Sequence, residues 1–184
     1  MFSGYFHRSR VRQFNLYLVR YTSIVMIFTI MGLKAAHAQI LHFKFTHINI
    51  SQGISNSTIE TIYQDSKGYM WFGTRDGLNR YDGYQVKVFK NQSNDPKSIS
   101  NNFIKCIYED AYHNLWIGTT NGLNRFNPYK NTFERYKHNP LNKESLSGND
   151  INCLYTDKRG TLWVGTNGGG LSRFDFTSNQ FKHF

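Results

Sequence analysis

Cysteine, charged residues and long hydrophobic runs are all scarce in this chain of 184 residues. The seven histidines are scattered without the spacing of metal ligands, and no Gly-x-Ser-x-Gly motif marks a hydrolase nucleophile. We therefore expect no metal, no cofactor and no catalytic residue. Only 18% of the residues are charged whereas 16% are aromatic, and aromatic side chains favour the half-buried surface of strands.

The two cysteines, Cys106 and Cys153, stand at equivalent positions of two sequence repeats. A disulfide needs α-carbons within about 7 Å of each other, and equivalent strands of neighbouring repeat units usually lie further apart. Export from the cytoplasm would permit a disulfide. We nevertheless expect two unpaired, small, buried side chains.

Acidic residues are few, and the formal net charge is +10. Five of the 22 basic residues and none of the 12 acidic residues lie in residues 1–38, which leaves 17 basic against 12 acidic residues in the rest. That remainder has no dense basic run, such as a nucleic-acid-binding tail would show. We therefore expect no nucleic-acid binding.

Residues 1–38 have the layout of a signal peptide. A basic, acid-free start is followed by an apolar stretch of ten residues, Ile24–Leu33, and then by Ala36-His37-Ala38. A spanning helix needs about 20 apolar residues. We therefore expect cleavage between Ala38 and Gln39 and a periplasmic mature chain. An uncleaved anchor is the alternative, although Arg20 interrupts the apolar stretch that it would need.

Three repeats follow, centred on tryptophans that are 45 and 47 residues apart. Each repeat predicts four short strands, and this period is typical of the blades of a β-propeller. We therefore predict an all-β fold in which three four-stranded antiparallel blades form part of a propeller. The predicted strands of the first repeat are Ile59–Tyr63, Trp71–Thr74, Leu78–Tyr81 and Val86–Phe89, and the predicted blades are residues 54–98, 99–145 and 146–184.

The same residues recur at fixed offsets in each repeat. An Asp opens a turn after the first strand, where a short carboxylate bonds the backbone, and a Gly three residues later favours a positive φ. His113 replaces that Gly in the second repeat. Trp and a second Gly then lie on one face of the next strand, where the missing side chain lets a neighbour approach. These structural positions are Asp65, Gly68, Trp71, Gly73, Thr74, Gly77, Asp110, Trp116, Gly118, Thr119, Gly122, Asp157, Gly160, Trp163, Gly165 and Thr166.

Residues 39–53 come before the first repeat and include Phe43–Phe45. This segment resembles the fourth strand of a blade, but no first, second or third strand precedes it. The chain also ends on a predicted fourth strand, at Phe184. Because propellers typically have 4–8 blades, we expect this chain to be a truncated piece whose partners include the remaining blades of a longer protein.

The pattern Asp-x-x-Gly-x-x-Trp-h-Gly-Thr-x-x-Gly-Leu-x-Arg-h-Asp/Asn, with h apolar, resembles the two-component regulator propeller repeat. It stands here as Asp65–Asp82, as Asp110–Asn127 with His113 as a departure, and as Asp157–Asp175 with one extra Gly. The resemblance covers about residues 43–184. It implies the periplasmic sensor of a Bacteroidetes-type hybrid two-component system, with a histidine kinase as the full-length protein, glycan ligands and a homodimer.

The turns after the second strands and the connections between repeats should share one face of the propeller. Their polar side chains suit sugar hydroxyls, so we predict a ligand surface there, the alternative being ordinary solvated turns. A free-standing exported propeller that binds carbohydrate or protein is a second hypothesis, and a propeller-based glycan hydrolase or lyase is a third. The candidate ligand-binding residues are Arg75, Asp76, Thr120, Asn121 and Asn167.

Overall fold

The computed structural model describes residues 17, 20–26 and 45–184. They fall into two units, residues 1–46 and 47–184, which are considered separately. In the first unit, residues 20–26 are helical. The predicted cleavage site at Ala38 and Gln39 lies outside the described residues. Among the residues that are described, no helix has both the length and the apolar character needed to cross a membrane.

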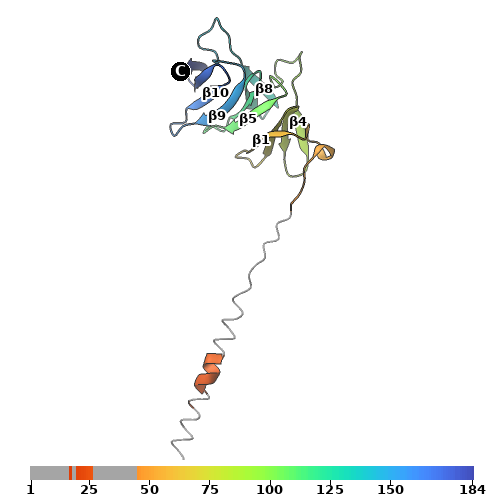
Figure 1. The fold of residues 1–184 in the computed structure, drawn as a ribbon, viewed down its shortest axis with the longest axis vertical. Helices are drawn as coiled ribbons and strands as arrows, with labels where there is room; N and C mark the ends of the chain where they lie inside the picture. Colours follow the sequence, from red (N-terminus) through yellow and green to blue (C-terminus); the bar gives the residue numbers. More distant parts are fainter. Residues whose placement is uncertain (1–16, 18–19, 27–44) are drawn as a thin grey trace, which may run out of the picture. The chain divides into compact units, whose positions relative to one another are not determined.

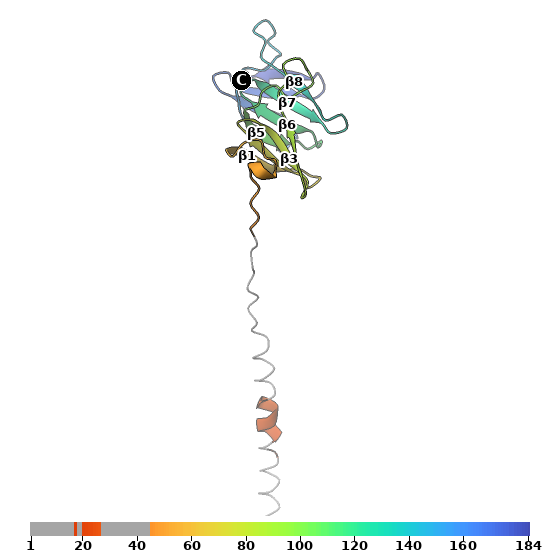
Figure 2. The ribbon, with the colours of Figure 1, turned by 90° about the vertical axis from the view of Figure 1, so that its right-hand side faces the viewer.

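The second unit consists of three four-stranded sheets in which each strand pairs with the next along the chain (Figures 1 and 2). All of the pairings are antiparallel, so the prediction of three four-stranded antiparallel sheets is confirmed. The first sheet comprises β1 (Ile59–Gln64), β2 (Met70–Thr74), β3 (Gly77–Tyr81) and β4 (Val86–Phe89). The second comprises β5 (Ile104–Glu109), β6 (Leu115–Thr119), β7 (Gly122–Asn127) and β8 (Thr132–Tyr136). The third comprises β9 (Ile151–Thr156), β10 (Leu162–Thr166), β11 (Gly170–Asp175) and β12 (Gln180–His183).

The first strands of the three sheets are neighbours in space. Strand β1 contacts β5, and β5 contacts β9 (Figure 1). The fourth strands, β4, β8 and β12, form the opposite edges of their sheets. This arrangement is the radial stacking of propeller blades, with the first strands on the inside.

Stacking buries the aromatic face of each sheet against the next. Trp71 packs edge-on against Phe126 of the second sheet, with ring centroids 5.1 Å apart, and Trp116 packs in the same way against Phe174 of the third sheet, also at 5.1 Å. Both tryptophans are almost fully buried. Since a buried large apolar side chain contributes about 1.5–3 kcal/mol, the stability of each blade depends on its neighbour.

The Gly that follows each Trp by two residues allows the inner strands to approach closely. A Cβ atom at Gly73 would lie 2.7 Å from Cγ2 of Ile104 in the next sheet, and one at Gly118 would lie 2.7 Å from Cγ2 of Ile151. Carbon atoms do not pack this closely, so these positions exclude any side chain. A Cβ atom would also collide with a side chain of the first strand of the same sheet, namely Thr61 at Gly73, Cys106 at Gly118 and Cys153 at Gly165. Packing within each sheet and between sheets therefore explains the recurring Trp-x-Gly.

The recurring Asp joins the first turn of each repeat to the Trp. Oδ1 of Asp65 accepts hydrogen bonds from the backbone N–H groups of Lys67 and Tyr69, and Oδ2 accepts one from Nε1 of Trp71 at 2.8 Å. The equivalent indole bonds are 2.7 Å long at Asp110 and 3.0 Å long at Asp157. One carboxylate thus closes the turn and orients the ring.

The expected positive φ is present in this turn of every repeat. It is 86° at Gly68, 81° at Gly160 and 61° at His113. A histidine tolerates this left-handed conformation at a small steric cost that Gly does not have.

The segment before the first sheet forms a short 3₁₀ helix, Ile50–Gln52, capped by the side chain of Asn49. Most of the predicted strand at Phe43–Phe45 lies outside the described residues. Phe45 itself belongs to no strand and is exposed. The pairing of this segment with a further blade stays a prediction.

The two cysteines are free thiols, as expected. Burial raises the pKa of the Cys106 thiol to about 12. Cys106 is only partly buried and Cys153 is exposed, so the prediction of two buried side chains is wrong for Cys153 and only partly met for Cys106. The reason is that Ile151 of the third sheet covers the face of the second sheet that carries Gly118 and Cys106, whereas no described residue covers the equivalent face of the third sheet.

Candidate ligand-binding site

The turns between the second and third strands are held by the Thr of each Gly-Thr pair. Oγ1 of Thr74 donates to the carbonyl of Gly77 at 2.9 Å and accepts from the backbone N–H of Asp76 at 3.0 Å. Thr119 makes the same two bonds in the second repeat, at 2.9 and 3.0 Å. Both hydroxyls are buried, so these turns present their remaining polar side chains from a fixed backbone.

Arg75 and Asp76, the candidates in the first turn, each form an ion pair within the chain. Nε of Arg75 lies 2.6 Å from Oε1 of Glu60, and its guanidinium lies 5.4 Å from the ring centroid of Phe103. Oδ2 of Asp76 lies 2.6 Å from Nζ of Lys90. Because exposed ion pairs contribute little stability, a ligand could replace either partner at low cost.

Of the candidates in the second and third turns, Thr120 and Asn167 bond to neighbouring segments, whereas Asn121 bonds within its own turn. Oγ1 of Thr120 donates to Oδ1 of Asn101 at 3.1 Å, and the backbone N–H of Asn121 donates to Oγ1 of Thr119 at 3.0 Å. Nδ2 of Asn167 donates to Oδ2 of Asp150 at 3.0 Å.

Lys105 extends this polar group. Its ammonium lies 2.8 Å from Oδ1 of Asp150 and also donates to Asn152. Hydrogen bonds from Lys105 and Asn167 hold the pKa of Asp150 below its usual range. A carboxylate, an ammonium and two amides from the second and third repeats are thereby joined into one network.

Glu60, Lys105 and Asn152 were not predicted as site residues. Each occupies a β-bulge on the first strand of its sheet, where the pairing register shifts by one residue. A bulge redirects a side chain, and here it directs polar groups to the turns. The sequence signal is a polar residue directly after the first Ile of each inner strand.

The five predicted residues thus lie on equivalent turns of three successive sheets, but none of their described hydrogen bonds joins two of them. Their role in ligand binding stays a prediction. Within the described part of the chain, no cluster of three or more His, Cys, Asp or Glu side chains could hold a metal ion.

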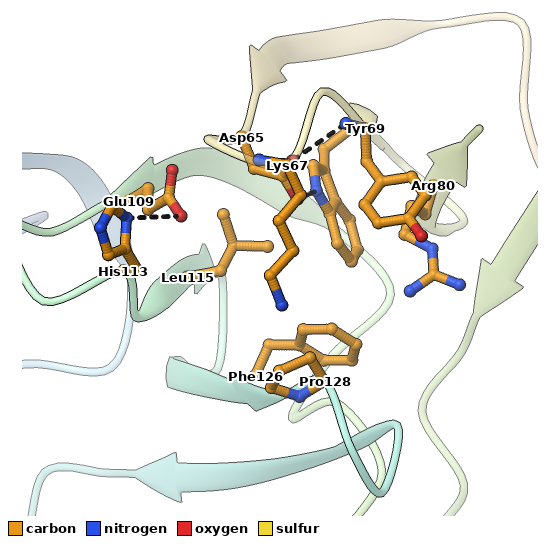
Figure 3. A pocket seen from close by; sticks show the side chains of 10 residues that line it. Asp65, Lys67, Tyr69, Arg80, Glu109, His113, Leu115, Phe126 and Pro128 are labelled. Carbon is orange, nitrogen blue, oxygen red and sulfur yellow. Dashed lines mark hydrogen bonds and ion pairs between the residues drawn. The ribbon is translucent and has the colours of Figure 1, made fainter. Parts of the chain in front are cut away.

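A second polar region, which was not predicted, lies between the first and second sheets. It is a hollow of about 150 Å³ (Figure 3). The first turns of both repeats and the end of β7 surround it. Its lining consists of Asp65, Lys67, Tyr69, Trp71, Arg80, Glu109, His113, Leu115, Phe126 and Pro128.

The two carboxylates of this hollow are occupied by protein donors. Asp65 bonds its own turn and Trp71, as described above. Glu109 accepts from the backbone N–H and from Oγ of Ser66, both at 2.7 Å, and lies 3.6 Å from Nδ1 of His113. Glu109 therefore joins the second sheet to the first turn of the first.

Two cationic side chains project into the hollow. Figure 3 shows the ammonium of Lys67 and the guanidinium of Arg80 beside the space above Phe126 and Pro128. The guanidinium lies 4.6 Å from the ring centroid of Tyr69. Within the described residues, neither cationic head forms an ion pair, and the hollow contains two cationic side chains and two carboxylates.

Three segments of the chain match the sequence model of the two component regulator propeller family, namely residues 53–76, 98–121 and 145–168. Each segment runs from the approach to a first strand through the second strand and its turn, and therefore contains the Asp, Trp and Gly-Thr positions described above. Each matched segment thus covers the first two strands of one sheet.

Two known proteins place these repeats in context. The chain is 40% identical over 78 residues to histidine kinase P4 of Formosa agariphila, a match that covers 42% of this chain and 6% of that protein. It is also similar to the extracellular domain of a hybrid two component system from B. thetaiotaomicron, with 32% identity and a TM-score of 0.70. That match covers 76% of this chain and 20% of the solved domain, so the chain spans about a fifth of it.

Proposed function

We propose, since the chain carries three two-component regulator propeller repeats, that it forms part of the periplasmic sensor of a hybrid two-component system. The observation that carries this proposal is the likeness, at 32% identity and a TM-score of 0.70, to the extracellular domain of such a system. The full-length protein would then be a membrane-anchored histidine kinase, and this chain would have a binding role and no catalytic one.

The ligand that we propose is a glycan fragment, bound on the face that carries the turns after the second strands. Three features support this choice. The backbone of the turns is fixed, the amide of Asn167 is exposed, and the ion pairs of Arg75 and Asp76 can be exchanged for bonds to a ligand. Because the turns come from successive sheets, one ligand could bridge several blades. It would change the output only if it bound one arrangement of the blades more tightly than another.

Further blades of the same protein are the second kind of partner that we propose. The outer face of the third sheet carries a mostly apolar hollow lined by Cys153, Tyr155, Trp163, Gly165 and Leu171. Ile104 and Ile151 cover the equivalent Gly of the preceding sheets. An apolar β-branched residue of a following repeat would cover Gly165 in the same way.

The test is to reconstitute the full-length protein in lipid vesicles and to measure its autophosphorylation with a panel of oligosaccharides. We expect at least one glycan to change the phosphorylation rate, and we expect Arg75→Ala together with Asn167→Ala to weaken that response. Lys130→Ala, on the loop between β7 and β8, is the control. Glycan binding without any effect on phosphorylation would favour a free-standing binding propeller, and release of shortened glycans would favour a hydrolase or lyase.

A further inference from the structure

Four turns of this chain carry an Asp-Gly or Asn-Gly pair, a dipeptide with a chemistry of its own. The backbone nitrogen of the Gly can attack Cγ of the residue before it and close a five-membered succinimide ring. Glycine favours this reaction because it has no side chain in the way and its backbone rotates freely. Asparagine is the more reactive partner, since an ionised carboxylate is a poor electrophile. The pairs are Asp76-Gly77, Asp82-Gly83, Asn121-Gly122 and Asn167-Gly168.

The structure protects both pairs of the first repeat. The N–H of Gly77 donates to the carbonyl of Asn102 at 2.8 Å, so its nitrogen is held away from Asp76. Asp82 is an acid, and hydrogen bonds from the backbone N–H groups of Gln85 and Tyr84 hold its pKa below the usual range. Its carboxylate therefore stays ionised near neutral pH and does not accept the nitrogen of Gly83.

The pair in the second repeat is protected by packing. The N–H of Gly122 donates to the carbonyl of Asn149 in the next repeat at 2.7 Å, and Gly122 is buried. A Cβ atom at Gly122 would lie 2.8 Å from the carbonyl oxygen of Tyr136, which shows how closely the chain is enclosed there. The nitrogen could reach Asn121 only after this hydrogen bond breaks and the turn moves.

The pair in the third repeat has none of these restraints. This turn is one residue longer, so Gly170 pairs with Thr166 and takes the place that Gly122 has in the second repeat. A following repeat would therefore meet Gly170 and leave Gly168 as an extra residue. Gly168 is exposed, has a φ of 81° and has no atom within 4 Å of an added Cβ. No described residue accepts a hydrogen bond from its N–H.

The side chain of Asn167 is also accessible. Its Nδ2 donates to Oδ2 of Asp150 at 3.0 Å, and both residues belong to the polar network that includes Lys105. Loss of this nitrogen would remove the donor and leave a second carboxylate beside Asp150. Two carboxylates at this distance repel each other, so the network would lose its link to the turn.

We propose that Asn167 is a site of spontaneous deamidation. The nitrogen of Gly168 bonds to Cγ of Asn167, the Cγ–Nδ2 bond breaks, and Nδ2 leaves as ammonia with the amide proton of Gly168. Water then opens the ring at either carbonyl and gives an aspartyl or an isoaspartyl residue. The reaction turns a donor on the candidate ligand face into an anion. It goes beyond the proposed sensor function and does not depend on it, because no ligand takes part.

Peptide mapping of the full-length protein after incubation at mildly alkaline pH tests the proposal. The tryptic peptide Gly160–Arg173 contains Asn167 as its one asparagine, so mass spectrometry reports this site directly. We expect Asn167 to deamidate at least about tenfold faster than Asn121, since breaking the hydrogen bond of a buried N–H costs about a factor of this size. Equal rates in the native protein, or a faster reaction at Asn121, would overturn the proposal. Aspartate without any isoaspartate would refute the ring mechanism.

Denatured protein is the matched control, because both asparagines precede a Gly. We expect equal rates at Asn121 and Asn167 in denaturant. A preference for Asn167 that persists there would come from the local sequence and would sink the structural explanation.

Two variants test the reaction and its consequence. Asn167→Gln keeps the amide but requires a six-membered ring, so the modification should stop at this site; an unchanged rate of ammonia loss would contradict the mechanism. Asn167→Asp imitates the aspartyl product, and the pKa of Asp150 should rise because Asp150 loses a hydrogen bond and gains a like charge. NMR titration measures this, and an unchanged pKa would show that the product leaves the network intact.

Discussion

Replacement of Trp116 by alanine tests the central packing of this fold. The indole is fully buried, lies 5.1 Å from the ring of Phe174 and 5.5 Å from that of Tyr136, and donates a 2.7 Å hydrogen bond to Asp110. Removal of a buried Trp side chain costs about 3–5 kcal/mol. Asp110 keeps its backbone donors, so the lost hydrogen bond adds only about 1 kcal/mol.

We therefore expect Trp116→Ala to lower the free energy of unfolding by about 4 kcal/mol or more, measured by urea denaturation of the 184-residue chain. At about 2–4 °C for each kcal/mol in a protein of this size, the melting temperature should fall by roughly 8–16 °C. Trp116→Phe keeps most of the ring and loses the hydrogen bond, so its cost should be about 1–2 kcal/mol.

Trp163→Ala is the matched control, because this indole occupies the same position of the third repeat but is only partly buried. Its replacement should cost less than half as much as that of Trp116. A Trp116→Ala protein within about 1 kcal/mol of the wild type would refute the placement of the indole in the core, and so would equal costs at the two positions.

Three further predictions concern single polar groups. Asp110→Ala removes a carboxylate that is only 4% exposed and should lower the free energy of unfolding by about 2–3 kcal/mol; urea denaturation checks this, and a loss below about 1 kcal/mol would contradict it. Because burial raises the pKa of Cys106 to about 12, iodoacetamide at pH 8 should label the exposed Cys153 and reach Cys106 only in denaturant; mass spectrometry of native protein labelled at both thiols would show this to be wrong. Lys105→Met should raise the pKa of Asp150 toward its usual 3.8, as followed by NMR titration. Since folding lowers the pKa of Asp150, its carboxylate stabilises the folded wild type at pH values above the pKa that Asp150 has in the unfolded chain. This contribution is lost as the pH falls through the folded-state pKa. An unchanged pKa of Asp150 in the Lys105→Met variant would argue against the hydrogen-bond network of Lys105, Asp150 and Asn167.

Local sequence features were sufficient to predict the three sheets. The turn residues and the short apolar runs act over a few neighbouring residues, and all twelve strands are present. The strand ends shift by one residue, as at Gln64, because the strand continues to the Asp that closes the turn. The role of that Asp as a turn former followed from its position, but its bond to the indole did not, because the bond spans six residues and depends on the rotamer of the ring.

The candidate surfaces were predicted less completely. The turns at Arg75, Asp76 and Asn167 followed from the repeat, whereas the bulged residues Glu60 and Lys105 that bond to them did not. A bulge changes which way a side chain points, and a polar residue after the first Ile marks these positions only once the shift in strand pairing is known. The hollow at Lys67 and Arg80 was missed because it forms between two repeats, and a pattern within one repeat carries no information about what faces it.

The sequence by itself therefore determined the number of sheets, their strand order and the residues that close each turn, because these follow from contacts within a repeat. Only the tertiary structure decided how the sheets stack and which polar groups remain without a partner. Ile104 against Gly73, and the ring of Tyr112 against that of Phe176, both depend on the distance between two sheets. That distance is set by the packing of side chains from different repeats, which no pattern within one repeat specifies.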